Sequence, residues 1–143
     1  MPYKYLEEIA IADIAFEAWG STPEELFKAA ADATMNVMVA DLSTIAEGEK
    51  RRIELEEENL DLLLFNFLQE LIYYKDAQRL LLRVDNVHIE KTQKGFKLRA
   101  EACGEELNPE KHDLRVDVKA VTLHQFHVKK TSEGWWAQVI LDI

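Results

Sequence analysis

Two aspartates of this 143-residue chain stand in apolar surroundings, where a carboxylate needs a partner. Asp13 lies inside the apolar run 9–16, and Asp142 follows three apolar residues. Burying a carboxylate is costly unless it is paired or bound to a metal. The α-carboxylate of Ile143 adds a second negative group one residue from Asp142. Because Ca²⁺ and Mg²⁺ are bound by several oxygens of this kind, Asp142 and Ile143 form a candidate cation site.

Simpler interpretations of both aspartates stay open. Asp13 also suits a strand end or a turn in water, and we weigh that alternative evenly against a buried partner. Asp142 and Ile143 also suit a frayed, solvated terminus, which is the usual state of chain ends. Whether Asp13 joins Asp142 depends on tertiary structure and does not follow from their spacing.

Lys119 and His124 form a second candidate group. Lys119 could neutralise an acidic site or contact phosphate, although an ion pair with neighbouring side chains is the simpler role. His124 on an apolar face is more often a hydrogen-bonded core histidine. A small enzyme that uses Asp13, Lys119 and His124 as acid and base groups would need all three within hydrogen-bond reach. A regular strand over 115–128 puts Lys119 and His124 on opposite faces, which argues against that enzyme unless a bulge intervenes.

The composition and the absence of known motifs argue against several classes of function. A net charge of −10 disfavours direct RNA binding, because acidic groups repel phosphate. An acidic chain can still serve RNA chemistry by docking on a basic enzyme or by holding a cation. The sequence has no Gly-rich phosphate loop, no GxSxG or HExxH motif and no EF-hand pattern, so we expect no autonomous nucleotide-hydrolysing enzyme. Cys103 is the only cysteine, which excludes an internal disulfide, and we expect an inert thiol in a strand.

The expected compartment is the cytoplasm. Residues 1–8 lack the apolar core of a signal peptide, and no apolar run approaches the ~20 residues that span a bilayer. We therefore expect no membrane partner.

Two helices are predicted, over 23–40 and 59–75. Thr22 can cap the first helix, and Glu25 completes the spacing of a capping box. Asn59 is the candidate cap of the second helix. Apolar residues then recur at helical spacing on a wide face, which indicates a central core helix.

The remaining segments are extended or alternate apolar and polar residues, as strands do. They cover 2–8, 12–19, 50–57, 82–91, 96–104, 115–130 and 134–142. Turn residues at 93–95 and 132–134 predict two hairpins. Two helices with about six or more strands, paired mostly with sequence neighbours, indicate an α+β fold in a single domain, 1–143. The helices should cover one face of an antiparallel or mixed sheet, or lie against two small sheets.

Several short segments, taken in order, resemble the archease family over essentially the whole chain. They are Ala12-Asp13-Ile14 with Ala18-Trp19-Gly20 and Glu24-Glu25-Leu26-Phe27; Asp41-Leu42-Ser43-Thr44; residues 64–73; Gly104-Glu105 leading to His112; Val118-Lys119-Ala120-Val121-Thr122-Leu123-His124; and the terminal 139–143. The segment from Val118 to His124 is the most distinctive. Each piece is short, but jointly they are specific.

The resemblance implies a function. Archeases assist the RtcB-type RNA ligase of tRNA splicing, which uses GTP to join a 3′-phosphate or 2′,3′-cyclic phosphate end to a 5′-hydroxyl end. A family member is a protein cofactor and not an enzyme; it promotes guanylylation of the ligase and multiple turnover. The resemblance also implies a divalent cation at Asp13, Asp142 and Ile143, with Ca²⁺ first and Mg²⁺ or Mn²⁺ as alternatives. Lys119 and His124 match the family's recurrent motif as a candidate functional surface, and RNA would be reached only through the ligase.

The chain departs from the family at one place. The family usually shows His-Thr just before Ala-Asp, where this chain has Ala10-Ile11. This replaces a polar pair that could have supported Asp13, so we expect weaker cation binding or other supporting groups. The alternative function is a general chaperone-like interaction protein, which predicts activity toward unrelated clients and indifference to cations. The sequence leaves the oligomeric state open.

Overall fold

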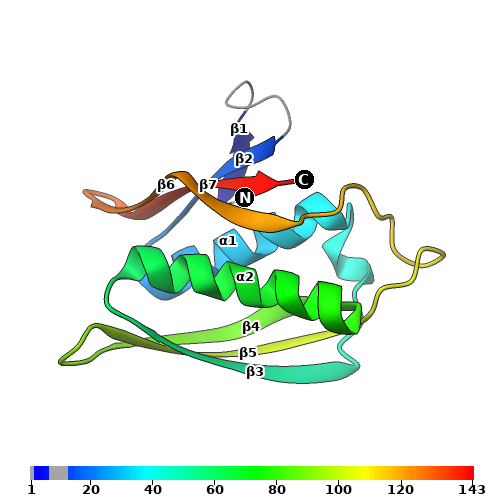
Figure 1. Ribbon diagram of the computed structural model, residues 1–143, viewed down its shortest axis with the longest axis horizontal. Helices are drawn as coiled ribbons and strands as arrows, with labels where there is room; N and C mark the ends of the chain where they lie inside the picture. The colour runs from blue at the N-terminus through cyan, green and yellow to red at the C-terminus, as the bar shows by residue number, and fades with distance from the viewer. Residues whose placement is uncertain (1, 7–12) are drawn as a thin grey trace.

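Seven strands and two long helices make up the part of the chain that the computed structural model describes, residues 2–6 and 13–143 (Figure 1). One sheet has the strand order β1-β2-β7-β6 and the other β3-β5-β4, and all neighbouring strands are antiparallel. The strands are β1 (Tyr3–Leu6), β2 (Asp13–Gly20), β3 (Glu49–Glu57), β4 (Leu80–Lys91), β5 (Phe96–Glu106), β6 (Ala120–Thr131) and β7 (Gly134–Asp142). The predicted α+β class is confirmed, and of the two arrangements expected for the helices the structure has the one with two small sheets.

The helices α1 (Pro23–Met38) and α2 (Leu60–Gln78) lie between the two sheets (Figure 1). Thr22 Oγ1 accepts the N–H of Glu25 at 3.2 Å, which confirms the predicted cap of α1. Asn59 caps α2 in the same way and accepts the N–H of Leu62 at 2.9 Å. α2 runs three residues beyond its predicted end because the chain leaves the helix only at Arg79, which is left-handed with φ 53°. A short 3₁₀ helix, η1 (Leu42–Thr44), follows α1.

One continuous apolar core fills the space between the sheets. Phe67 of α2 is fully buried, and its ring lies 5.9 Å from that of Phe27 on α1. Phe16 of β2 reaches this core from one sheet and Leu98 of β5 from the other, and neither is exposed. α2 is therefore the central core helix that its apolar face predicted.

The predicted strand over 115–130 is wrong over its first five residues. β6 begins only at Ala120. The segment before it bonds to the end of α1: Arg115 donates its N–H to the carbonyl of Met38 at 2.9 Å, and Leu114 forms an isolated bridge with Val39. These main-chain groups find their partners in another element, which the local pattern does not reveal.

The expectation of a regular strand is also wrong beyond Thr122. The register with β7 shifts between Thr122 and His127, so that four residues of β6 bulge opposite one of β7. Gln125, inside the bulge, has a positive φ of 51°. As a result Phe126 packs edge-on against Phe65 of α2, with ring centres 5.8 Å apart. The bulge changes the direction of every side chain after Thr122 from the direction it would have in a regular strand.

Among the described residues, neither helix has the length and apolar character needed to cross a bilayer.

Candidate functional site

The pairing of β2 with β7 brings Asp13 and Asp142 together at one end of the first sheet. The two residues are direct partners in the antiparallel register. Such partners project from the same face of a sheet, with Cβ atoms about 4.5–5.5 Å apart. Both aspartates are partly buried. Two like charges placed directly opposite each other are destabilising, and a cation between them would relieve that repulsion.

The neighbouring residues fix the face on which the two carboxylates lie. Ile14 and Leu141, the next register pair, pack against the apolar core, so Asp13 and Asp142 project from the opposite face. Within the described residues, no basic side chain forms an ion pair with either aspartate. Ile143 also packs partly against the core and follows Asp142 directly, so its main-chain oxygens are the next along the chain. These oxygens are the donor set that a hard cation such as Ca²⁺ takes, and the residues therefore fit the implied metal.

Lys119 belongs to the same corner of the sheet. It is the last loop residue before β6, and Ala120, which follows it, pairs with Asp142. The N–H of Lys119 donates to the main-chain carbonyl of Asp142 at 2.8 Å, while its side chain is exposed. His124 does not join this group. It lies in the bulge of β6 and is exposed, so the interpretation as a core histidine is wrong.

A buried lysine of α2 anchors the loop that carries Lys119. Lys75 is only 6% exposed, and its ammonium donates to the carbonyl of Val118 at 2.8 Å and to the carboxylate of Asp117. Asp76 adds a second carboxylate at 2.6 Å. Burial by itself lowers the pKa of Lys75, but the hydrogen bonds and charges of Asp117 and Asp76 outweigh it and raise the pKa overall. Lys75 therefore stays charged and ties the loop to the central helix.

A second anchor holds the start of the same loop. His112 is almost fully buried; its Nε2 lies 2.9 Å from Glu105, and its Nδ1 accepts the N–H of Asn108 at 2.9 Å. Glu105 also accepts from Lys111 at 2.7 Å and from the N–H of Ala46 at 2.8 Å. The hydrogen bonds from Lys111, Ala46 and His112 lower the pKa of Glu105 to about 2. The structure thus gives His112 a carboxylate partner seven residues away.

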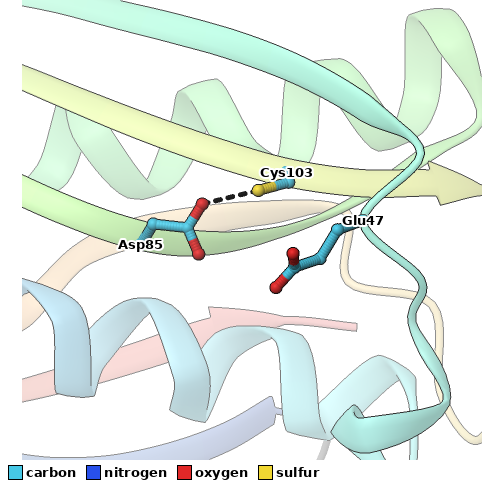
Figure 2. Close-up of side chains that lie close together, drawn as sticks. All are labelled: Glu47, Asp85 and Cys103. Carbon is cyan, nitrogen blue, oxygen red and sulfur yellow. Dashed lines mark hydrogen bonds between the residues drawn. The ribbon is translucent and has the colours of Figure 1, made fainter.

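A separate cluster lies beside the second sheet, where Asp85 of β4, Cys103 of β5 and Glu47 of the loop before β3 point toward one another (Figure 2). Their ligand atoms all lie within 4.8 Å of one another, and the thiol of Cys103 contacts Asp85 Oδ2 at 2.5 Å. Asp85 is the residue that the register of β4 skips, so a bulge turns its carboxylate toward the thiol. The hydrogen bond to Asp85, with burial and the charge of Glu47, raises the pKa of Cys103 to about 11. A thiol with that pKa is protonated at neutral pH, which agrees with an inert cysteine.

Sequence reasoning missed the buried lysine, although a signal was present. Lys75 continues the apolar stripe of α2, three residues after Ile72 and four after Leu71. A charged residue at such a position needs a buried partner. The partners of Asp85 and His112 carried no comparable signal, because a bulge and a loop create them. Ala10 and Ile11, which replace the polar pair expected before Asp13, lie outside the described residues.

Comparisons with known proteins agree on one family. The model of the Archease protein family (MTH1598/TM1083) matches residues 3–143. "Protein archease" of Thermococcus kodakarensis is 44% identical over 133 residues, which cover 92% of this chain and 93% of that protein. "Protein archease" of Methanopyrus kandleri is 33% identical over 143 residues and covers both chains completely.

Two solved structures share the fold. The solution structure of protein 1598 of Methanobacterium thermoautotrophicum has a TM-score of 0.85 and 34% identity, and the match covers 99% of each chain. The crystal structure from Thermotoga maritima described as an archease, possible chaperone, has a TM-score of 0.63. Its identity is 18%, with 98% of this chain and 100% of that chain covered, so it supports the fold alone.

Proposed function

Because the chain belongs to the archease family, we propose that it activates the RtcB-type GTP-dependent RNA ligase of tRNA splicing by promoting guanylylation and multiple turnover. It does so as a protein cofactor with no reaction of its own. Its net charge of −10 favours a protein partner over RNA, which it reaches only through the ligase. The compartment of this activity is the cytoplasm.

The observation that carries the proposal is the direct register pairing of Asp13 with Asp142. Together with the main-chain oxygens of Ile143, the two carboxylates would hold a divalent cation, with Ca²⁺ first and Mg²⁺ or Mn²⁺ as alternatives. When bound, the cation supplies positive charge to an otherwise acidic corner of the protein. The N–H of Lys119, bonded to the carbonyl of Asp142 at 2.8 Å, holds the main chain of this corner in place.

The exposed side chain of Lys119 adds a fixed positive charge beside that corner. A surface that combines an ammonium group with a carboxylate-bound cation can approach the phosphate groups held by the ligase, which the bare carboxylates would repel. His124 and the exposed Leu123 in the β6 bulge offer a neighbouring contact surface for the partner.

Cation binding is tested first, by calorimetric titration with Ca²⁺. The wild-type chain should bind the ion, and Asp13→Asn and Asp142→Asn should each weaken binding at least tenfold. Without Ca²⁺, Asp13→Asn should raise the free energy of unfolding by about 0.2–1 kcal/mol, because it removes a like-charge pair. Asp113→Asn is the matched control, since Asp113 is exposed in a loop. Equal Ca²⁺ affinity in all four proteins would exclude this site.

The activation itself is tested with the cognate ligase, GTP and RNA with a 3′-phosphate and a 5′-hydroxyl end. Substoichiometric wild-type protein should raise multiple-turnover ligation strongly. Asp13→Asn, Asp142→Asn and Lys119→Ala should reduce that stimulation while keeping the wild-type circular dichroism spectrum. A competent ligase that shows no stimulation would overturn the proposal. Suppression of aggregation of unrelated client proteins, without dependence on Ca²⁺, would then support the chaperone alternative.

A further inference from the structure

All three tryptophans of the chain line one open cleft, at the opposite end of the first sheet from Asp13 and Asp142. The cleft has a volume of about 810 Å³ and lies between the start of α1, the end of β2 and the β6–β7 hairpin. Figure 1 shows this hairpin and the C-terminus at opposite sides of the sheet. Trp19 lies six positions after Asp13 along β2, which is about 20 Å. The cleft is therefore a separate surface from the proposed cation site.

The sheet register sets the rings of Trp19 and Trp136 beside one another on one face of the sheet, whereas Trp135 projects from the opposite face and packs partly against the core. Trp19 and Trp136 are direct partners on β2 and β7, and Trp135 is opposite Gly20. Gly134 lies so close that a Cβ atom there would stand 2.4 Å from the carbonyl oxygen of Gly20. The hairpin thus packs tightly on the end of β2. Trp19 nevertheless remains 39% exposed, so its ring is accessible to a partner.

Two of the rings already carry cationic or heteroaromatic neighbours. The ammonium of Lys130 lies 6.0 Å from the centre of the Trp135 ring, and the imidazole of His127 stacks on Trp136 at 6.5 Å with an interplanar angle of 15°. An indole face attracts cations because its π electrons carry negative charge. Lys130 itself lies outside the lining of the cleft, but its contact shows that the indole of Trp135 accepts a cationic neighbour.

The charges that line the cleft are mainly negative. Its lining includes two ammonium groups, from Lys4 and Lys28, and four carboxylates, from Glu17, Glu25, Asp32 and Glu133. Lys4 pairs with Glu17 at 3.8 Å, and Arg83 binds Asp32 at 3.2 Å from outside the cleft. Glu133, at the tip of the hairpin, is exposed and forms no ion pair among the described residues. An acidic rim around indole rings repels nucleic acid and suits a basic ligand.

We propose that this tryptophan cleft is a docking site for an arginine-bearing segment of a protein partner. A guanidinium group is planar, stacks on aromatic faces and binds carboxylates with two parallel hydrogen bonds, and the cleft offers both kinds of group. Arginine should be preferred over lysine for the same reason. The exposed ring of Trp19, with Trp136 beside it on the same face, provides the stacking surface, and Glu133 provides the carboxylate. This role does not depend on the cation site or on the identity of the ligase.

The test is a titration of the full chain with the peptide Gly-Arg-Gly-Arg-Gly, followed by the NMR signals of the three indole N–H groups. We expect saturable shifts of the signals of Trp19 and Trp136, weaker shifts with Gly-Lys-Gly-Lys-Gly and none with Gly-Glu-Gly-Glu-Gly. Trp19→Ala should weaken binding about three- to tenfold. Glu133→Gln should weaken it about two- to threefold.

Matched controls separate the cleft from general effects. Tyr73→Ala removes another exposed aromatic side chain, 55% exposed on α2, and Glu90→Gln removes an exposed carboxylate on β4. Neither should change peptide binding. The proposal fails if the arginine peptide does not shift the indole signals, or if Trp19→Ala binds it as well as the wild type while retaining its fold. Stronger shifts with a single-stranded oligonucleotide than with the peptide would also overturn it. Because the titration contains neither the ligase nor a divalent metal ion, its result is independent of the proposed function.

Discussion

Replacing the buried lysine of α2 by methionine should loosen the loop that ends at the acidic corner. Lys75 is 6% exposed and is the donor to the carbonyl oxygen of Val118, itself fully buried. In Lys75→Met this oxygen keeps no donor, which costs about 1–3 kcal/mol. Methionine is chosen because it keeps the length and the apolar contacts of the lysine stem.

The ion pairs of Lys75 contribute less than their short distances suggest. The side chains of Asp117 and Asp76 are 68% and 54% exposed, so both carboxylates return to water when the ammonium is removed. Removing the ammonium also relieves its own burial cost, which offsets part of the loss. We therefore expect a net destabilisation of about 1–2 kcal/mol, well below the ~3–5 kcal/mol for breaking a fully buried pair.

Two measurements check this prediction. Urea denaturation should show a midpoint lowered by about 0.5–1 M in Lys75→Met. Amide hydrogen exchange should show faster exchange at Lys119, whose N–H bonds to the carbonyl of Asp142 at 2.8 Å. Lys28→Met on the exposed face of α1 is the control and should change neither quantity. Unchanged stability together with unchanged protection of the Lys119 amide would refute the idea that Lys75 anchors this loop.

Three further predictions follow from other contacts. The pKa of Glu105 falls from 4.5 to about 2 on folding. The contribution of this carboxylate to the free energy of unfolding is therefore complete above about pH 4.5 and is lost as the pH falls toward 2. Glu105→Gln should accordingly flatten the acid limb of a curve of stability against pH. Asp85→Asn should speed alkylation of Cys103 at pH 8 at least tenfold in a thiol-modification assay, because Asp85 is the largest cause of the raised pKa of about 11. Gly104→Ala should lower the free energy of unfolding, measured by urea denaturation, by about 2–3 kcal/mol, because the added Cβ would stand 1.6 Å from a main-chain carbonyl oxygen. Gly48→Ala is the control and should lower it far less, because the nearest atom is 3.7 Å away.

The local pattern was sufficient for most of the secondary structure. Thr22 and Asn59 cap the helices as predicted, since a cap depends on residues within one turn. The apolar face of α2 predicted the core helix, because helical periodicity is a property of the segment itself. The strand prediction was wrong at 115–119, where main-chain groups bond to the distant end of α1. It was wrong again in the β6 bulge after Thr122, because a register shift depends on the partner strand.

The sequence by itself determined the α+β class, the acidic character that disfavours RNA as a direct partner, and the two aspartates in apolar settings. The resemblance of its short segments also indicated the family to which the chain belongs. Only the tertiary structure decided that Asp13 and Asp142 are register partners, that Lys119 joins them and that His124 does not. It also gathered the three tryptophans in one cleft and gave His112, Lys75 and Cys103 their partners. The physical reason is that sequence periodicity fixes which face of an element a residue occupies, whereas contacts between faces depend on strand register, bulges and loop closure across the whole chain.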